Sequence, residues 1–209
     1  MPVQSATTID EKPLANWLFN EIPSSQVMVR EFQFEHSAGT HFGLSTKAIA
    51  PSARGPGDID ALVFSQIALE RSTAFEIKRV KVDAITFDTK MPGKVAGLRH
   101  GVEQVNLLAE IGFYRTYLLI AIVTDGRERH EFGLPFRGAN AEILQSIRNF
   151  PGRHDLHPAV GLAFVELTQT VEKDVQYAGS IGVQIAVQAK HVQQTRELTD
   201  AITHVVPKL

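Results

Sequence analysis

Two consecutive segments of the chain carry charged side chains that could do chemistry together. The segment 58–66 (DIDALVFSQ) contains Asp60, and the segment 73–82 (TAFEIKRVKV) contains Glu76 and Lys78. Both patterns are typical of β-strands, whose side chains alternate between two faces, so Glu76 and Lys78 point to the same side. These charges stand among apolar residues, where a charge is costly unless it is paired or bound to a metal. The pattern therefore indicates a polar site built on two strands.

The two segments are close enough in the chain to form an antiparallel hairpin. Their connection, around 69–72, is short, which favours a hairpin over a crossover. With a turn near Glu70, the register places Asp60 beside Arg79 and diagonally from Lys78. We therefore expect two carboxylates and an ammonium group to meet on one patch.

A helix after the second strand adds a polar side chain that points toward the sheet. The segment 95–112 is predicted as a helix, with an apolar stripe made of Val102, Val105, Leu108, Ala109 and Ile111. Gln104 lies inside this stripe and needs hydrogen-bond partners there, for which the charged strand residues are the nearest candidates. The segment 115–126 (RTYLLIAIVTDG) then reads as a strand buried on both faces. A strand, a helix and a strand form a crossover unit, so the two strands are predicted to be parallel.

The remaining segments complete a single α/β domain with a mixed sheet. Helices are predicted over 10–20, 140–150 and 193–205, and strands over 43–50, 160–167 and 181–189. The segment 26–36 (QVMVREFQFEH) is compatible with either a helix or a strand. The 209 residues are the length of one domain, and no linker divides them.

The composition excludes several classes of site. The chain has no cysteine, which excludes disulfides, thiolate zinc sites, iron–sulfur clusters and cysteine nucleophiles. Its 21 Lys and Arg residues nearly balance 23 Asp and Glu residues, so no global basic field attracts a polyanion. The segment 1–12 has no feature of a secretory signal, and the longest apolar stretch, 117–123, falls short of the roughly 20 residues that span a bilayer. We expect a cytoplasmic protein with no membrane partner.

As a set, these motifs resemble the PD-(D/E)xK nuclease superfamily. GDID at 57–60, FEIK at 75–78, the helix with an inward glutamine and the buried strand after it follow the order found in that superfamily, over about a third of the chain. The resemblance implies a restriction-endonuclease-like three-layer α/β domain with a central mixed β-sheet flanked by helices. It implies a nuclease-like core over about 24–126, followed by a C-terminal sheet and helix extension over about 127–209.

The resemblance also implies roles for individual residues. Asp60 stands for the acid of the second core strand, Glu76 and Lys78 for the (D/E)xK pair, and Gln104 for the glutamine found on the helix in many members. Asp60, Glu76 and the backbone carbonyl of Ile77 are hard oxygen ligands suited to Mg²⁺, with Mn²⁺ as a substitute. Such a metal polarises a phosphodiester and lowers the pKa of its bound water, while Lys78 orients that water or stabilises developing negative charge.

Two of these assignments have alternatives. Asp58 competes with Asp60, and we favour Asp60 because GDID resembles the form GEID, in which the last carboxylate carries the metal. The upstream acid that many members place on the first helix is either Glu31 or Glu35. This choice leaves the number of metal ions, one or two, undecided.

The implied function is metal-dependent hydrolysis of phosphodiester bonds in nucleic acid, most simply by a DNA endonuclease of restriction, repair or phage-defence type. Between residues 71 and 99 the chain has seven basic and three acidic side chains. An even spread would place about 3 basic residues there, so the excess favours contact with a phosphate backbone. A homodimer would allow both strands of DNA to be cut. The alternative is a catalytically inactive module on the same fold that binds nucleic acid or another protein.

Overall fold

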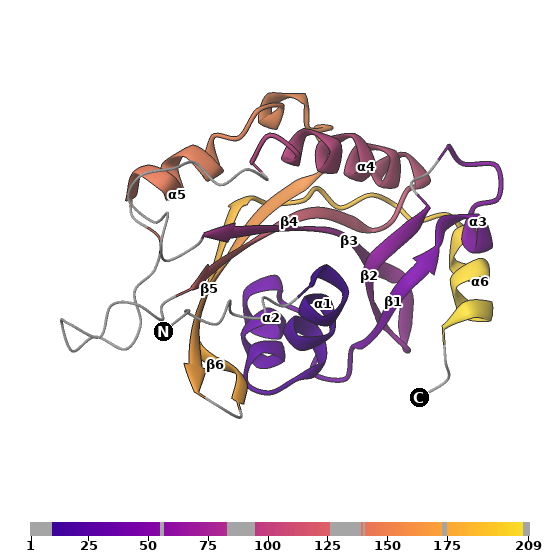
Figure 1. Ribbon diagram of the computed structural model, residues 1–209. Helices are drawn as coiled ribbons and strands as arrows, with labels where there is room; N and C mark the ends of the chain where they lie inside the picture. Colours follow the sequence, from indigo (N-terminus) through magenta and orange to yellow (C-terminus); the bar gives the residue numbers. More distant parts are fainter. Residues whose placement is uncertain are drawn as a thin grey trace, which may run out of the picture.

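Six strands form one mixed β-sheet in the order β1-β2-β3-β4-β5-β6. They belong to a computed structural model that describes residues 10–54, 57–82, 95–125, 139, 141–172 and 175–206. The strands are β1 Gly39–Ser45, β2 Asp58–Ser65, β3 Ala68–Val82, β4 Arg115–Asp125, β5 Gly161–Glu172 and β6 Val175–Val187. Figure 1 shows the sheet as a curved layer with helices on both of its faces.

The direction of each strand follows from how it is connected to the next one. β2 pairs antiparallel with both β1 and β3, and β5 pairs antiparallel with β6. β3, β4 and β5 are parallel, and helix α4 (Leu98–Ile111) lies between β3 and β4 in the chain. A parallel pair requires such a crossover, whereas antiparallel strands can follow one another directly. The charged hairpin β2–β3 therefore borders the parallel centre of the sheet.

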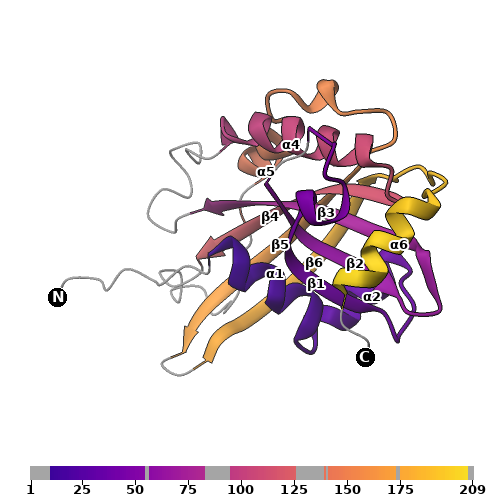
Figure 2. The ribbon, with the colours of Figure 1, turned by 90° about the vertical axis from the view of Figure 1, so that its right-hand side faces the viewer.

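The sheet separates two layers of helices. Helices α1 (Glu11–Asn20) and α2 (Ser24–Phe32) pack on one face, against apolar side chains that include Phe75, Tyr117 and Leu119. Helices α4 and α5 (Ala141–Arg148) pack on the opposite face, over the parallel strands. Helices α3 (Thr46–Ile49) and α6 (Arg196–Val205) lie together near β1 and β2, as Figures 1 and 2 show. Among the described residues, no helix is both long enough and apolar enough to cross a membrane.

Most of the predicted elements are present, and the prediction of an α/β fold with a mixed sheet is confirmed. The undecided segment 26–36 is mainly helix α2, because Met28 and Phe32, four residues apart, are both buried on one side of it. The strand predicted over 43–50 is wrong in its bounds. β1 starts earlier, at Gly39, and the chain turns into helix α3 after Ser45.

Candidate active site

Strands β2 and β3 separate at the position where the charged residues lie. The last registered pair in this direction is Ala61 with Phe75. Beyond this pair, the N–H of Ile77 on β3 has a side-chain acceptor in place of a backbone carbonyl of β2. It donates a hydrogen bond of 2.7 Å to Oδ2 of Asp60. Asp60 is half-buried, so its carboxylate is held at the opening between the two strands.

The register of the hairpin differs from the one predicted. Extended by one residue beyond the last pair, it places Asp60 opposite Glu76 and not beside Arg79. The chain turns directly after Ser65, earlier than the turn expected near Glu70, and the register also shifts next to that turn. This difference decides which face Asp60 shares, because opposite residues of an antiparallel pair lie on the same face: the predicted register puts Asp60 on the side of Arg79, whereas the observed register puts it on the side of Glu76 and Lys78.

Glu76 and Lys78 form a largely buried ion pair. The distance from Lys78 Nζ to Glu76 Oε1 is 2.5 Å. Glu76 is only 1% exposed, whereas 19% of the Lys78 side chain remains accessible. The second carboxylate oxygen, Glu76 Oε2, is buried without a hydrogen-bond partner among the described residues. A buried carboxylate oxygen without a partner is costly, so this atom marks a place for a further donor or a cation.

Helix α4 packs against the side chain of Lys78 through Gly101. A Cβ atom added at Gly101 would lie 2.8 Å from Lys78 Cγ and 3.1 Å from its Cε. These distances are shorter than carbon atoms adopt in contact, so only glycine allows α4 to pack this closely on the lysine. The helix thereby confines the aliphatic part of Lys78 while its ammonium group reaches Glu76.

A third acid reaches the site from helix α1. Glu11 Oε1 accepts a hydrogen bond of 3.3 Å from the N–H of Arg79. In an extended strand the backbone N–H groups of residues i and i+2, here Ile77 and Arg79, point to the same edge of the strand. The C=O of Ile77 points to that edge as well. The carboxylates of Asp60 and Glu11 therefore lie along one edge of β3, and the carbonyl of Ile77 opens between them.

Glu11 is not among the site residues predicted from the sequence. An acid in the first turn of a helix is common because it interacts favourably with the helix dipole, so Glu11 carries no distinctive signal in the sequence. Its position also precedes the range 24–126 that the resemblance implies for the nuclease-like core. The neighbouring Asp10 pairs with the side chain of Arg79, with 3.6 Å between Oδ1 and Nη1. The start of α1 is thus anchored to β3 by two adjacent acids.

Burial and the neighbouring charges shift the pKa values of Asp60, Glu76 and Lys78. Burial raises the pKa of Glu76 to about 7, and the negative charge of Asp60 adds to this rise, although Lys78 opposes it. Burial likewise raises the pKa of Asp60, against the hydrogen bond from Ile77. The pKa of Lys78 is lowered by burial, but the charge and hydrogen bond of Glu76 outweigh this effect and raise it overall. Glu11 contributes to all three shifts, so four charged groups share one electrostatic environment.

The structure also places the other candidates on β2 and α4. Asp58 is exposed, and Asp60 is the acid of this strand that contacts β3. The Oε1 atom of Gln104 is buried without a hydrogen-bond partner among the described residues. Within this part of the chain no hydrogen bond joins Gln104 to the charged groups, although it follows Gly101, which covers Lys78, by one helical turn. The structure thus brings together Asp60, Glu76 and Lys78 but not Asp58.

Neither Glu31 nor Glu35 lies at this site. Glu31 forms an ion pair of 2.7 Å with the adjacent Arg30 on helix α2. Glu35 accepts a hydrogen bond from Ser65, at the opposite end of β2 from Asp60. Among the described acids, the upstream one that reaches the site is Glu11.

The basic residues between 71 and 99 do not all lie at the candidate site. Arg71 lines a cavity beside Ser65, at the other end of the β2–β3 hairpin from Asp60. The part of this window from 83 to 94, which contains Lys90 and Lys94, lies outside the described residues. The expected contact with phosphates therefore stays a prediction.

The donor atoms at the opening suit a hard divalent cation. No group of three or more His, Asp or Glu side chains in the described part of the chain is arranged to hold a metal ion. Mg²⁺ usually requires only one or two carboxylates, since it retains several water molecules. Asp60 and Glu76 supply two carboxylates, one of them with the unpartnered Oε2, and Ile77 supplies a carbonyl. This all-oxygen set fits Mg²⁺ or Mn²⁺.

No protein-family model matches the chain, and no match was found among curated proteins or solved structures. The comparisons therefore neither support nor contradict the resemblance to PD-(D/E)xK nucleases. A functional interpretation rests on the residues at the β2–β3 opening and on their geometry.

Proposed function

We propose that the protein is a Mg²⁺-dependent nuclease with a restriction-endonuclease-like fold, most simply a DNA endonuclease. The observation that carries this proposal is the convergence of Asp60, Glu76 and Lys78 where β2 and β3 separate. Buried charged groups are usually paired and fully hydrogen-bonded. Here the buried Glu76 pairs with Lys78, the half-buried Asp60 lies nearby, and one oxygen of Glu76 has no donor among the described residues.

The surrounding elements support the same proposal. The acids come from two antiparallel strands, and the next strand, β4, returns parallel to β3 after helix α4. A further acid, Glu11, comes from the first helix and contacts the same edge of β3. This combination matches the arrangement that the resemblance implies, with Glu11 in the role for which Glu31 and Glu35 were considered.

Each residue has a distinct part in the proposed reaction. Asp60, Glu76 and the Ile77 carbonyl would hold Mg²⁺, which supplies a water of lowered pKa and polarises the phosphodiester. Lys78 is partly exposed and within reach of the acids, so it can orient the attacking water or stabilise the negative charge on the phosphate. Glu76 would shift from its ion pair with Lys78 toward the cation, which frees the ammonium group for the substrate.

The direct test is cleavage of supercoiled plasmid DNA, linear duplex DNA and single-stranded RNA with Mg²⁺ and with a chelator. We expect cleavage of at least one substrate by the wild-type protein, and none with the chelator. Lys78→Ala and Asp60→Asn should each lower the rate by about 100-fold or more, because each removes a group that acts on the reacting phosphate or its metal.

Matched variants separate loss of chemistry from loss of structure. Asp58→Asn changes the exposed acid two residues before Asp60, and Lys47→Ala removes an exposed lysine on helix α3. Both should keep the wild-type rate. Absence of any metal-dependent cleavage, or equal rates in Asp60→Asn and Asp58→Asn, would contradict the proposal. Salt-dependent binding of DNA without cleavage would favour the inactive module instead.

A further inference from the structure

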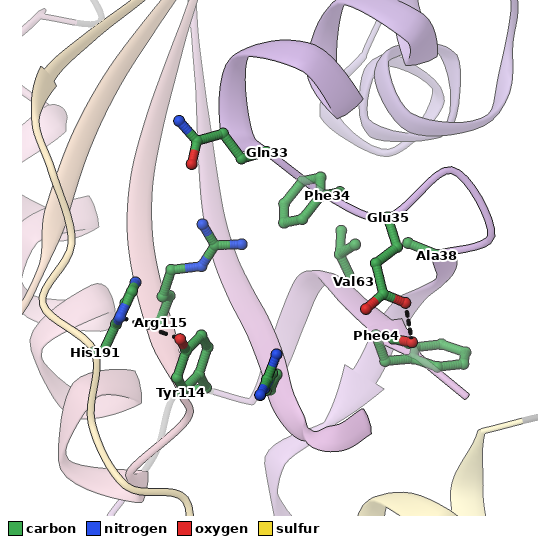
Figure 3. Close-up of a pocket in the computed structure, with 11 residues that line it drawn as sticks. Gln33, Phe34, Glu35, Ala38, Val63, Phe64, Tyr114, Arg115 and His191 are labelled. Atoms are coloured by element: carbon green, nitrogen blue, oxygen red, sulfur yellow. Dashed lines mark hydrogen bonds between the residues drawn. The ribbon is translucent and has the colours of Figure 1, made fainter. Parts of the chain in front are cut away.

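A second site lies at the opposite end of the β2–β3 hairpin. A cavity of about 210 Å³ opens there between the end of helix α2, the end of β2 and the start of β4. Its wall includes Phe34, Glu35, Tyr114, Arg115 and His191, which Figure 3 shows facing the same space. None of these residues takes part in the proposed nuclease chemistry.

Arg115 is a buried cation that no carboxylate among the described residues pairs with. It is 8% exposed and donates hydrogen bonds to the carbonyl of Phe32 (2.9 Å) and to Thr73 Oγ1 (3.2 Å). Both acceptors are neutral, and no carboxylate of the described residues forms an ion pair with this guanidinium group. Burial lowers the pKa of Arg115, although Tyr117 and Tyr114 oppose that effect. A buried charge is costly unless an opposite charge compensates it, so the cavity next to Arg115 is suited to an anion.

The rest of the lining indicates the class of anion. Arg71 adds a second guanidinium group, while the one acid of the lining, Glu35, is already bound by Ser65. Arginine presents a planar set of donors that matches a carboxylate or a phosphate. The two arginines and Glu35 together give the lining one net positive charge, which suits a ligand with a single anionic group.

Aromatic rings form much of the remaining surface of the cavity. Phe34 lies with its ring centre 5.1 Å from the guanidinium carbon of Arg115, and Tyr114 stacks on His191 at 4.6 Å. In Figure 3 Arg115 lies between Phe34 and the Tyr114–His191 pair. Aromatic rings associate through offset-stacked or edge-to-face contacts, so a flat ring joined to the anion would find partners here.

We propose that this cavity binds a small organic anion in which one phosphate or carboxylate group is attached to an aromatic ring. The oxyanion pairs with Arg115 and Arg71, and the ring packs against the aromatic wall. The site is separate from the β2–β3 opening. Thr73, which contacts Arg115, precedes Lys78 by five residues, about 17 Å along an extended strand. Arg115 also belongs to the side of the sheet that α1 and α2 cover, whereas Lys78 faces α4.

Calorimetric titration in a chelating buffer tests the proposal with two ligands, 5′-AMP as a ring-bearing phosphate and indole-3-acetate as a ring-bearing carboxylate. We expect at least one of them to bind with a submillimolar Kd. Adenosine and inorganic phosphate, which each lack one half of the ligand, should bind at least tenfold more weakly. Equal binding of adenosine and 5′-AMP, with no binding of indole-3-acetate, would overturn the proposal, as would no binding of either anion at 10 mM.

Variants locate the ligand. Arg71→Ala should weaken binding about tenfold, the loss expected for one charge-assisted hydrogen bond, and Arg115→Met should abolish it. Arg30→Ala, which removes an exposed arginine on helix α2, is the matched control and should bind as the wild type does. Because Arg115 also supports the fold, Arg71→Ala decides the outcome if Arg115→Met does not fold. Unchanged binding in Arg71→Ala would overturn the proposal.

The nuclease proposal and this one can fail separately. Lys78→Ala alters the β2–β3 opening and should leave ligand binding unchanged. Loss of binding in Lys78→Ala would show that the ligand occupies that opening and would overturn the separate site. Binding that persists in Lys78→Ala and is lost in Arg71→Ala would support it, whether or not the wild-type protein cleaves nucleic acid.

Discussion

The environment of the buried Glu76 carboxylate is unfavourable for its charge without a further cation. One of its oxygens contacts Lys78, the other has no partner among the described residues, and Asp60 adds a second negative charge nearby. The raised pKa of about 7 expresses this imbalance, because protonation removes a charge that is poorly compensated. The same property makes Glu76 sensitive to pH and to metal ions.

We predict that Glu76 makes the metal-free protein less stable as the pH rises. Its pKa is about 7 in the folded protein and 4.5 in the unfolded chain, so the folded state binds the proton more tightly. This contribution is fully present below pH 4.5 and is lost as the pH passes 7. Relative to Glu76→Gln, the free energy of unfolding of the wild type should fall by about 3 kcal/mol between pH 4.5 and pH 8. Urea denaturation at several pH values in a chelating buffer measures the difference.

The comparison with Glu76→Gln cancels the titration of groups elsewhere in the protein. The result that would contradict the prediction is a parallel pH dependence in the two proteins. Addition of Mg²⁺ should reduce the difference at pH 8, since a cation bound at Glu76 stabilises the ionised carboxylate.

Glu11 gives a second prediction at the level of single residues. Its carboxylate contacts the edge of β3 and shares the electrostatic environment of Asp60 and Glu76. Glu11→Gln should therefore lower Mg²⁺-dependent cleavage by about 10- to 100-fold, the effect of losing a group that supports metal ligands. Initial rates at several Mg²⁺ concentrations measure it, and Glu31→Gln and Glu35→Gln serve as controls. If all three variants cleave equally, Glu11 has no part in the site.

At the scale of elements, the site exists because the pairing between β2 and β3 ends before either strand does. Their regular pairing stops at Ala61 and Phe75, and the free backbone of β3 beyond this point receives the acids. The sequence predicted the hairpin and the alternation of side chains within each strand, since alternation is a property of any strand. It did not predict the register, because the turn after Ser65 and the irregularity beside it carry no strong turn motif.

Helix α4 leads to a prediction about Lys78. Gly101→Ala places a methyl group 2.8 Å from Lys78 Cγ, too close for two carbon atoms, so the lysine side chain must move. We expect cleavage to fall by about 10- to 100-fold, a loss typical of a displaced catalytic group. The free energy of unfolding should change little, since alanine favours a helix interior over glycine by about 1 kcal/mol and offsets part of the strain.

The control for this variant is Glu110→Ala, on the exposed side of the same helix. It should leave both the cleavage rate and the urea midpoint close to those of the wild type. Full activity in Gly101→Ala would show that the position of Lys78 is not critical for the reaction.

At the scale of the whole molecule, the sheet brings together acids from distant parts of the chain. Glu11 precedes Asp60 by 49 positions, and Glu76 follows on the next strand. A cation bound by these groups would link helix α1, β2 and β3, and would be released on unfolding. Ligands that bind only the folded state increase its stability.

We therefore predict that Mg²⁺ raises the melting temperature of the protein. About 10 mM Mg²⁺ should raise the Tm by a few degrees in the wild type, since each kcal/mol corresponds to about 2 to 4 °C in a protein of this size. The double variant Asp60→Asn/Glu76→Gln should show a shift below about 1 °C, and Asp58→Asn should keep the wild-type shift. Thermal melts at matched ionic strength, followed by circular dichroism, measure both. Equal shifts in the wild type and the double variant would place the metal elsewhere.

The sequence by itself determined the properties that depend on neighbours in the chain. Alternation placed Glu76 and Lys78 on one face, and hydrophobic periodicity predicted helix α4, the buried strand β4 and the parallel crossover between β3 and β4. The absence of cysteine limited the ligands to oxygen and nitrogen. These features follow from local geometry and composition, so they do not require knowledge of the folded chain.

Only the tertiary structure decided which distant residues meet. A hydrogen bond to β3 identifies Asp60, and not Asp58, as the acid of β2 at the site. Packing also brought Glu11 to β3 from a helix with no distinctive motif and placed Gly101 against the side chain of Lys78. It also buried Arg115 with no carboxylate partner in the described part of the chain, beside a cavity that no sequence pattern indicates. Contacts of this kind depend on how the helices pack on the sheet, and packing arises from the shapes of many side chains together.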